Sequence, residues 1–131
     1  MEINELTGQI IGAAMRVHSA VGPGLLESVY RTCMQYELVQ LGLKVQAEFP
    51  IPVVYRGVQL DVGYRVDFLV ENVVLVELKA LTTMLPVHEA QLLSYVRMSN
   101  RPIGLLINFH VLHLRDGIRR LVNEFPRKSN Q

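Results

Sequence analysis

The most constraining feature of this sequence is an apolar strand, an amphipathic helix and a second apolar strand in direct succession. Residues 73–80 (VVLVELKA) and 103–109 (IGLLINF) are short runs rich in valine, leucine and isoleucine, which is typical of strands covered on both faces. Between them, residues 86–98 begin with Pro86, a residue favoured in the first turn of a helix. A strand–helix–strand unit of this length predicts two parallel strands joined by a right-handed crossover.

Two further helices are expected near the start of the chain, over residues 4–20 and 25–41, where apolar side chains recur at helical spacing. The turn Gly22-Pro23-Gly24 separates them. From residue 43 the apolar residues alternate instead, which indicates strands. The expected order is α-α-β-β-β-β-α-β, and it predicts an α/β fold with a mixed central sheet and helices flanking it.

The strands before residue 80 are expected to pair antiparallel, because short turns join them. Turns are predicted at Arg56-Gly57 and at Glu71-Asn72, and a break is expected at Gly63. Pro50 and Pro52 place the segment 43–55 at an edge of the sheet or at a bulge, since proline cannot donate a ladder hydrogen bond. The segment after residue 110 forms either a short strand or a helix.

Composition sets the remaining bounds. The 131 residues fit one domain over 1–131 with a flexible tail at about 124–131, and 50% apolar with 19% charged residues is ordinary globular composition. The net charge of +1 gives no general basic excess. A single cysteine excludes an intrachain disulfide, and no segment is apolar over a membrane-spanning length, so a cytoplasmic protein without membrane contact is expected. The one basic cluster comprises Arg115, Arg119, Arg120, Arg127 and Lys128.

Three charged residues interrupt the apolar strands at the centre of the expected sheet. Glu77 and Lys79 are two apart and therefore share a face of their strand, and the turn at residues 71–72 brings Asp67 of the preceding strand near Glu77. Burying such groups is costly unless they are paired or bind a metal. One interpretation is an ion-pair network that fixes the strand register, and the other is a functional site.

The functional interpretation follows from the charge of the two carboxylates. Two carboxylates placed close together repel, and a divalent cation removes that repulsion. Mg²⁺ prefers oxygen ligands and is typically held by one or two carboxylates together with water and substrate phosphate. A bound metal polarises a phosphoryl oxygen, and a neighbouring lysine such as Lys79 can stabilise the charge that develops there. This combination is suited to phosphodiester hydrolysis.

Two of the expected helices carry residues that could join this site. Glu27 and Tyr30 are three apart on the second helix, and Tyr30 is either a core aromatic with a satisfied hydroxyl or a direct contributor. Gln91 and Tyr95 are four apart on the helix that follows Lys79, so an amide and a phenol share one face. They could hold a phosphate or fix the lysine.

Together these residues resemble known motifs. Asp67 followed by Glu77-Leu78-Lys79 resembles the D…(D/E)xK signature of the PD-(D/E)XK nuclease superfamily. The run from Gln91 to Tyr95 is similar to the QxxxY motif of its RecB-like branch, and the run from Gly24 to Tyr30 is similar to the motif that names the GxxExxY protein family within that superfamily. The resemblance covers nearly the whole chain, roughly from Ile10 to Val122.

The resemblance implies the α-β-β-β-α-β core of the restriction-endonuclease-like fold and a nuclease that acts on DNA or RNA, with DNA the more expected partner. It implies Mg²⁺ or Mn²⁺ as cofactor, with Asp67, Glu77 and Glu27 as metal ligands and Lys79 as the catalytic lysine. It also gives Gln91 and Tyr95 the task of orienting the substrate or the lysine.

A homodimer is a further expectation, since the chain has no obvious separate domain for target recognition. Val66 stands where the superfamily name has proline, a position without chemistry. The alternative is a catalytically silent nuclease-fold module that binds nucleic acid or protein.

Overall fold

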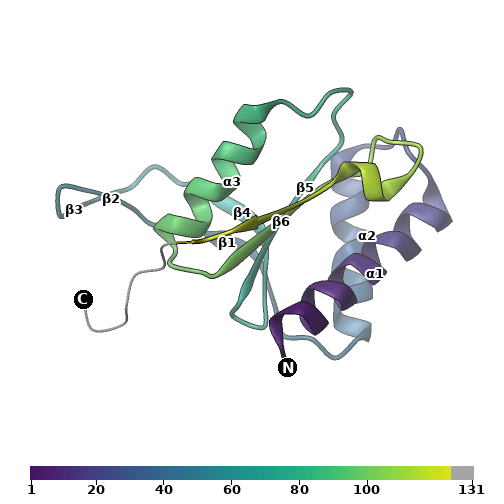
Figure 1. The fold of residues 1–131 in the computed structure, drawn as a ribbon, viewed down its shortest axis with the longest axis horizontal. Helices are drawn as coiled ribbons and strands as arrows, with labels where there is room; N and C mark the ends of the chain where they lie inside the picture. The colour runs from purple at the N-terminus through teal and green to yellow at the C-terminus, as the bar shows by residue number, and fades with distance from the viewer. Residues whose placement is uncertain (125–131) are drawn as a thin grey trace.

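The computed structural model describes residues 1–124 and has a mixed five-stranded sheet as its centre (Figure 1). The expected tail therefore lies, from residue 125 onward, outside the described residues. The strand order is β1-β4-β5-β6-β7. The strands are β1 (Val45–Pro50), β4 (Arg65–Val70), β5 (Val74–Lys79), β6 (Ile103–Asn108) and β7 (Ile118–Val122).

The predicted parallel unit is confirmed. β5 pairs with β6 in parallel and α3 (Pro86–Met98) connects them, with Pro86 as the first residue of the helix. The other three pairs of neighbouring strands are antiparallel. Because β1 pairs only with β4, the proline-containing segment lies at an edge, as its missing N–H donors require.

Helices cover both faces of the sheet. α1 (Ile3–Val21) and α2 (Glu27–Gln40) lie on one face and α3 lies on the other (Figure 1). Alternate residues of the central strands divide between two cores: Val76 and Leu78 of β5 pack with α1 and α2, whereas Leu75 packs with α3. The α/β class and the flanking helices expected from the sequence are thus confirmed. Within residues 1–124, no helix is both long enough and apolar enough to cross a membrane.

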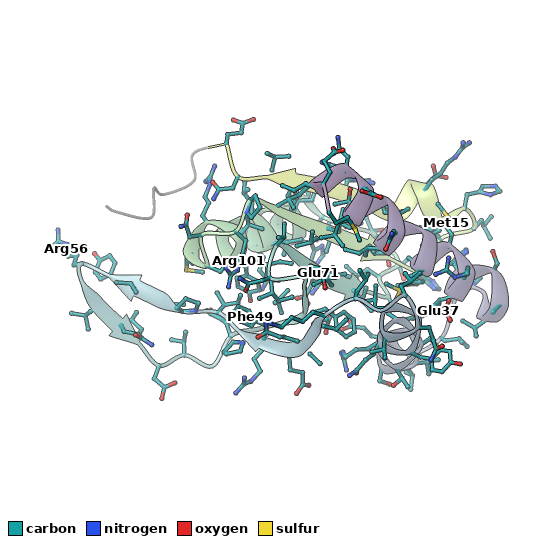
Figure 2. The ribbon with its side chains drawn as sticks, turned by 90° about the horizontal axis from the view of Figure 1, so that it is seen from below. Met15, Glu37, Phe49, Arg56, Glu71 and Arg101 are labelled. Carbon is teal, nitrogen blue, oxygen red and sulfur yellow. The ribbon has the colours of Figure 1, made fainter. Side chains whose placement is uncertain are left out.

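The expected strand count before α3 is wrong by one. The segment 43–55 does not form a single strand but is divided into β1 and β2 (Val53–Tyr55), and β2 pairs with β3 (Val58–Leu60) in a separate two-stranded sheet. The division falls at Pro52, which has no N–H to donate to a ladder. The resulting hairpin extends away from the body of the molecule, with Arg56 at its far end (Figure 2).

The segment after residue 110, which the sequence left open between strand and helix, contains both. A short 3₁₀ helix, η1 (Leu114–Gly117), leads directly into β7, the edge strand opposite β1. Gly117 is required there, because a Cβ at this residue would collide with the backbone oxygen of Asn108. The close approach of η1 to the end of β6 brings this last segment back against the sheet.

Candidate active site

Asp67 and Glu77 lie where the pairing of β4 with β5 ends. The ladder runs from Val70–Val74 to Phe68–Val76, and in the same register Asp67 would stand opposite Glu77. At that position the side chains take over the hydrogen bonding. The Asp67 N–H donates to Glu77 Oε1 at 3.1 Å, and the Leu78 N–H donates to Asp67 Oδ2 at 2.7 Å. The two carboxylates are therefore fixed by the backbone of the neighbouring strand.

Burial changes the ionisation of this pair. Burial raises the pKa of Glu77 to about 8, and hydrogen bonding to Asp67 and the negative charge of Asp67 act in the same direction. The positive charge of Lys79 and the Asp67 N–H partly oppose that increase. Near neutral pH Glu77 therefore retains a proton beside Asp67. A bound cation would lower the pKa of Glu77 and release that proton.

Lys79 lies beside Glu77 on the same face of β5. Its Nζ is 3.9 Å from Glu77 Oε2, and both side chains are largely buried. Asn108, which pairs with Lys79 across β5 and β6, accepts a hydrogen bond from the Leu81 N–H at 2.9 Å and donates one to the Leu81 carbonyl at 2.9 Å. Asn108 thus fixes the chain just after the lysine. The sequence analysis missed this residue, and a polar side chain ending an apolar strand was its only signal.

Glu27 is connected to Asp67 through a residue that the sequence analysis also missed. Arg31 lies one turn after Glu27 on α2; its Nε donates to Asp67 Oδ1 at 2.8 Å and its Nη2 donates to Glu27 Oε1 at 3.1 Å. The pair at positions 27 and 31 has the i, i+4 spacing of a helical ion pair, which was the available signal. The bridge to Asp67 depends on the tertiary fold and could not be read from spacing.

The loop before α2 positions Glu27. Gly24 has a φ of 92°, a conformation that favours glycine, and Glu27 is the first residue of the helix. The Tyr30 hydroxyl donates to the Gly22 carbonyl at 2.6 Å and accepts from the Leu25 N–H at 3.1 Å. The Tyr30 ring is buried and stacks on Phe109 at a centroid distance of 4.4 Å. Of the two roles considered for Tyr30, the structure shows the core aromatic with a satisfied hydroxyl.

α3 contributes Tyr95 to the surroundings of Glu77. Tyr95 is 5% exposed, and burial, the charge of Glu77 and Tyr64 raise its pKa, in that order. Tyr64, which the sequence analysis did not single out, has its ring centroid 5.7 Å from that of Tyr95. Gln91 is exposed one turn earlier, and within the described part of the chain it makes no hydrogen bond to Glu77 or Lys79. Its orienting role stays a prediction.

The sequence matches the profile of the PD-(D/E)XK nuclease superfamily over residues 4–121. The chain belongs to the PD-(D/E)XK nuclease superfamily. Searches of curated proteins and of solved structures gave no match. The resemblance inferred from Asp67, Glu77 and Lys79 is therefore confirmed for the superfamily.

Nucleases of this superfamily are typically metal-dependent, and the side chains around Asp67 and Glu77 decide whether a divalent cation fits here. Within residues 1–124, no three His, Cys, Asp or Glu side chains are grouped so that they could hold a metal by themselves. Two carboxylates completed by water and phosphate oxygens suffice for Mg²⁺, and Asp67 with Glu77 supplies such a pair. Both carboxyl groups are largely buried and lie within one hydrogen-bonded cluster, so their oxygens form a donor set that fits a divalent cation.

Proposed function

We propose that this member of the PD-(D/E)XK superfamily is a Mg²⁺- or Mn²⁺-dependent nuclease that hydrolyses phosphodiester bonds of DNA or RNA. DNA is the more expected substrate. The observation that carries the proposal is the arrangement at the end of the β4–β5 ladder. There Asp67 and Glu77 lie one position beyond the last ladder pair, each hydrogen-bonded to a backbone N–H across the strand pair, and Lys79 lies 3.9 Å from Glu77. The buried carboxyl pair, with a Glu77 pKa raised to about 8 chiefly by burial, and a lysine beside it form the kind of cluster that is common at functional sites.

Each residue of the site has a role that follows from its position. Asp67 and Glu77 would hold the cation, which when bound activates a water molecule and polarises a phosphoryl oxygen. Lys79 would stabilise the negative charge that develops on the phosphate, because its ammonium group shares the face of Glu77. Glu27, which Arg31 joins to Asp67, would assist the metal or its water. Tyr95 and Gln91 would orient the substrate.

We further infer that the chain belongs to the GxxExxY family. The structure gives the three named positions of that motif separate tasks. Gly24 forms the turn, Glu27 begins the helix beside the site, and Tyr30 fastens the loop to the core. A motif whose positions jointly place one carboxylate near Asp67 supports a catalytic assignment rather than a chance match.

Nucleic acid as the partner and a homodimer are also proposals. The basic cluster named from the sequence is only partly available in the described residues. Arg120 donates to Thr7 Oγ1 and Asn4 Oδ1 of α1, and Arg119 lies 3.9 Å from Glu89 of α3. Arg127 and Lys128 lie outside the described residues. Phosphate contacts from this cluster would make binding weaken with salt.

The test is hydrolysis of single-stranded DNA, duplex DNA and RNA with Mg²⁺ and with Mn²⁺. Glu77→Gln and Lys79→Ala should each lose cleavage by about 10²-fold or more, because the first removes a carboxylate that holds the cation and the second removes the charge that stabilises the developing negative charge on the phosphate. Glu37→Gln is the matched control, since Glu37 is an acid in an ion pair with Arg16 at the surface. Equal residual cleavage in the wild type and both site variants would mean contamination, and the proposal would fail.

The catalytically silent module is the second candidate, and one observation favours it. Asp67 is bound by Arg31 at 2.8 Å, so a protein cation already serves one of the proposed metal ligands. A silent module should show no saturable Mn²⁺ binding that Asp67→Asn and Glu77→Gln abolish. Saturable binding that both substitutions abolish would exclude this candidate.

A further inference from the structure

Arg31 lies between two of the proposed metal-site carboxylates. It reaches Asp67 Oδ1 with Nε and Glu27 Oε1 with Nη2, at 2.8 and 3.1 Å. The side chain of Asp67 is 10% exposed, whereas that of Arg31 is 33% exposed, so Arg31 approaches the buried carboxylate from the solvent side. Among the described residues, Arg31 is the one cationic side chain in direct contact with Asp67.

The two oxygens of Asp67 have different kinds of partner. Oδ2 accepts from the Leu78 N–H, a backbone donor that β5 holds in place. Oδ1 accepts from Arg31, a flexible side chain that can leave without disturbing the sheet. A guanidinium and a divalent cation bound to the same carboxylate would repel strongly at such short separation in a partly buried site. The cation must therefore displace Arg31 from Oδ1 or bind against its charge.

We propose that Arg31 and the divalent cation exchange at Asp67, and that the released Arg31 then binds a phosphate of the nucleic acid. The proposal rests on the proposed function and adds a residue that neither the motifs nor the family match assigns. In the metal-free protein Arg31 neutralises Asp67 and Glu27. After exchange its planar fork of donors, which remains charged at every relevant pH, is released on the solvent side of Asp67 and suits a phosphate of the nucleic acid.

Exchange has a signature that a merely structural ion pair lacks. If Arg31 only stabilised the fold, its removal would loosen Asp67 and weaken the binding of metal and of nucleic acid alike. If Arg31 competes with the cation and then binds substrate, its removal strengthens metal binding and weakens nucleic-acid binding. The two effects have opposite signs, so the measurements need no activity assay.

The first experiment is calorimetric titration of the full chain with Mn²⁺. Arg31→Gln retains an amide that can donate to Asp67 but removes the charge, and we expect it to bind Mn²⁺ about tenfold more tightly than the wild type. Arg16→Gln is the matched control, because Arg16 forms a 2.7 Å ion pair with Glu37 away from the site. Its Mn²⁺ affinity should equal that of the wild type. Equal or weaker Mn²⁺ binding by Arg31→Gln overturns the exchange.

The second experiment measures binding of a fluorescein-labelled DNA duplex by anisotropy, in the presence of Mn²⁺ and in a Lys79→Ala background that stops cleavage. Adding Arg31→Gln should lower affinity about three- to tenfold and reduce the slope of log affinity against log salt by about 1, the loss of one phosphate contact. An unchanged affinity and slope would overturn the substrate role.

Arg31→Lys provides an independent variant should Arg31→Gln fold poorly. Lysine has a single donor group and cannot span Glu27 and Asp67 as the guanidinium does, so its Mn²⁺ affinity should lie between those of the wild type and Arg31→Gln. Affinity equal to the wild type would contradict the exchange. The failure of the wider proposal looks different: if no variant, including the wild type, binds Mn²⁺, the metal-dependent function itself is wrong.

Discussion

Replacing Glu77 by glutamine tests the electrostatics of the site in the free protein. Glu77 has a pKa raised to about 8 from its ordinary value of 4.5, chiefly by burial and then by Asp67. A folded-state pKa above the unfolded value means that the folded protein binds the proton more tightly. The resulting stabilisation is complete below about pH 4.5 and is lost as the pH rises to about 8. Glutamine cannot ionise, so Glu77→Gln should lack this pH dependence.

The magnitude follows from the two pKa values. The interval from 4.5 to about 8 spans about 3.5 pKa units, and 1.36 kcal/mol per unit gives about 5 kcal/mol for the whole effect. Between about pH 5 and about pH 9 the wild type should lose about 4 kcal/mol of unfolding free energy relative to Glu77→Gln. Glutamine Oε1 can still accept from the Asp67 N–H, so the substitution preserves the cross-strand hydrogen bond.

Urea unfolding at a series of pH values measures this difference. The difference in free energy between Glu77→Gln and the wild type isolates Glu77 from other groups that titrate in the same range. Glu37→Gln, in the surface pair with Arg16, retains Glu77 and should follow the wild-type profile. If the wild type and Glu77→Gln give parallel profiles from about pH 5 to about pH 9, Glu77 is not a protonated buried carboxyl group and the reasoning is refuted.

Two further predictions concern the packing around the site. Gly104→Ala should lower the free energy of unfolding by about 1–3 kcal/mol in urea, because its Cβ would lie 2.8 Å from a side-chain atom of α3. Gly8→Ala is the control: it has no such neighbour within 4 Å and should raise the free energy of unfolding by up to about 1 kcal/mol. Equal effects would show that α3 does not approach β6 so closely. Tyr30→Phe should cost about 1–3 kcal/mol and speed amide hydrogen exchange at Leu25, because the hydroxyl accepts from that N–H and donates to Gly22. Unchanged exchange at Leu25 would contradict this role for the hydroxyl.

Local sequence patterns were sufficient where one element decides the outcome. The apolar runs flanking residues 86–98 predicted the parallel unit, since parallel strands need a long crossover connection and a helix of that length supplies it. The turn at Glu71-Asn72 was likewise correct, and both residues have the positive φ of a tight hairpin. The turn at Arg56-Gly57 was predicted too, but the sequence did not show that its hairpin forms a sheet of its own. Whether a hairpin joins the main sheet depends on distant strands.

The candidate site divides in the same way. The spacing of Glu77 and Lys79 on one strand placed them on one face, and the structure puts them 3.9 Å apart. Arg31 could not be found, because its contact with Asp67 joins residues 36 apart in the chain and depends on how α2 packs against the sheet. Tyr64 and Asn108 were missed for the same reason, since their partners come from other elements.

Periodicity and motif spacing are local properties of the chain, so they were enough to predict the fold class, the superfamily and the charged residues in the core. The ionisation and the partners of those charged residues depend instead on how the strands and helices pack. The ladder of β4 and β5 ends one position before Asp67 and Glu77, so the two carboxyl groups accept from backbone N–H groups, and their burial raises the pKa of Glu77. The side chains become buried and oriented only when the helices pack against the sheet. The packing of α2 also brings Arg31 into contact with Asp67.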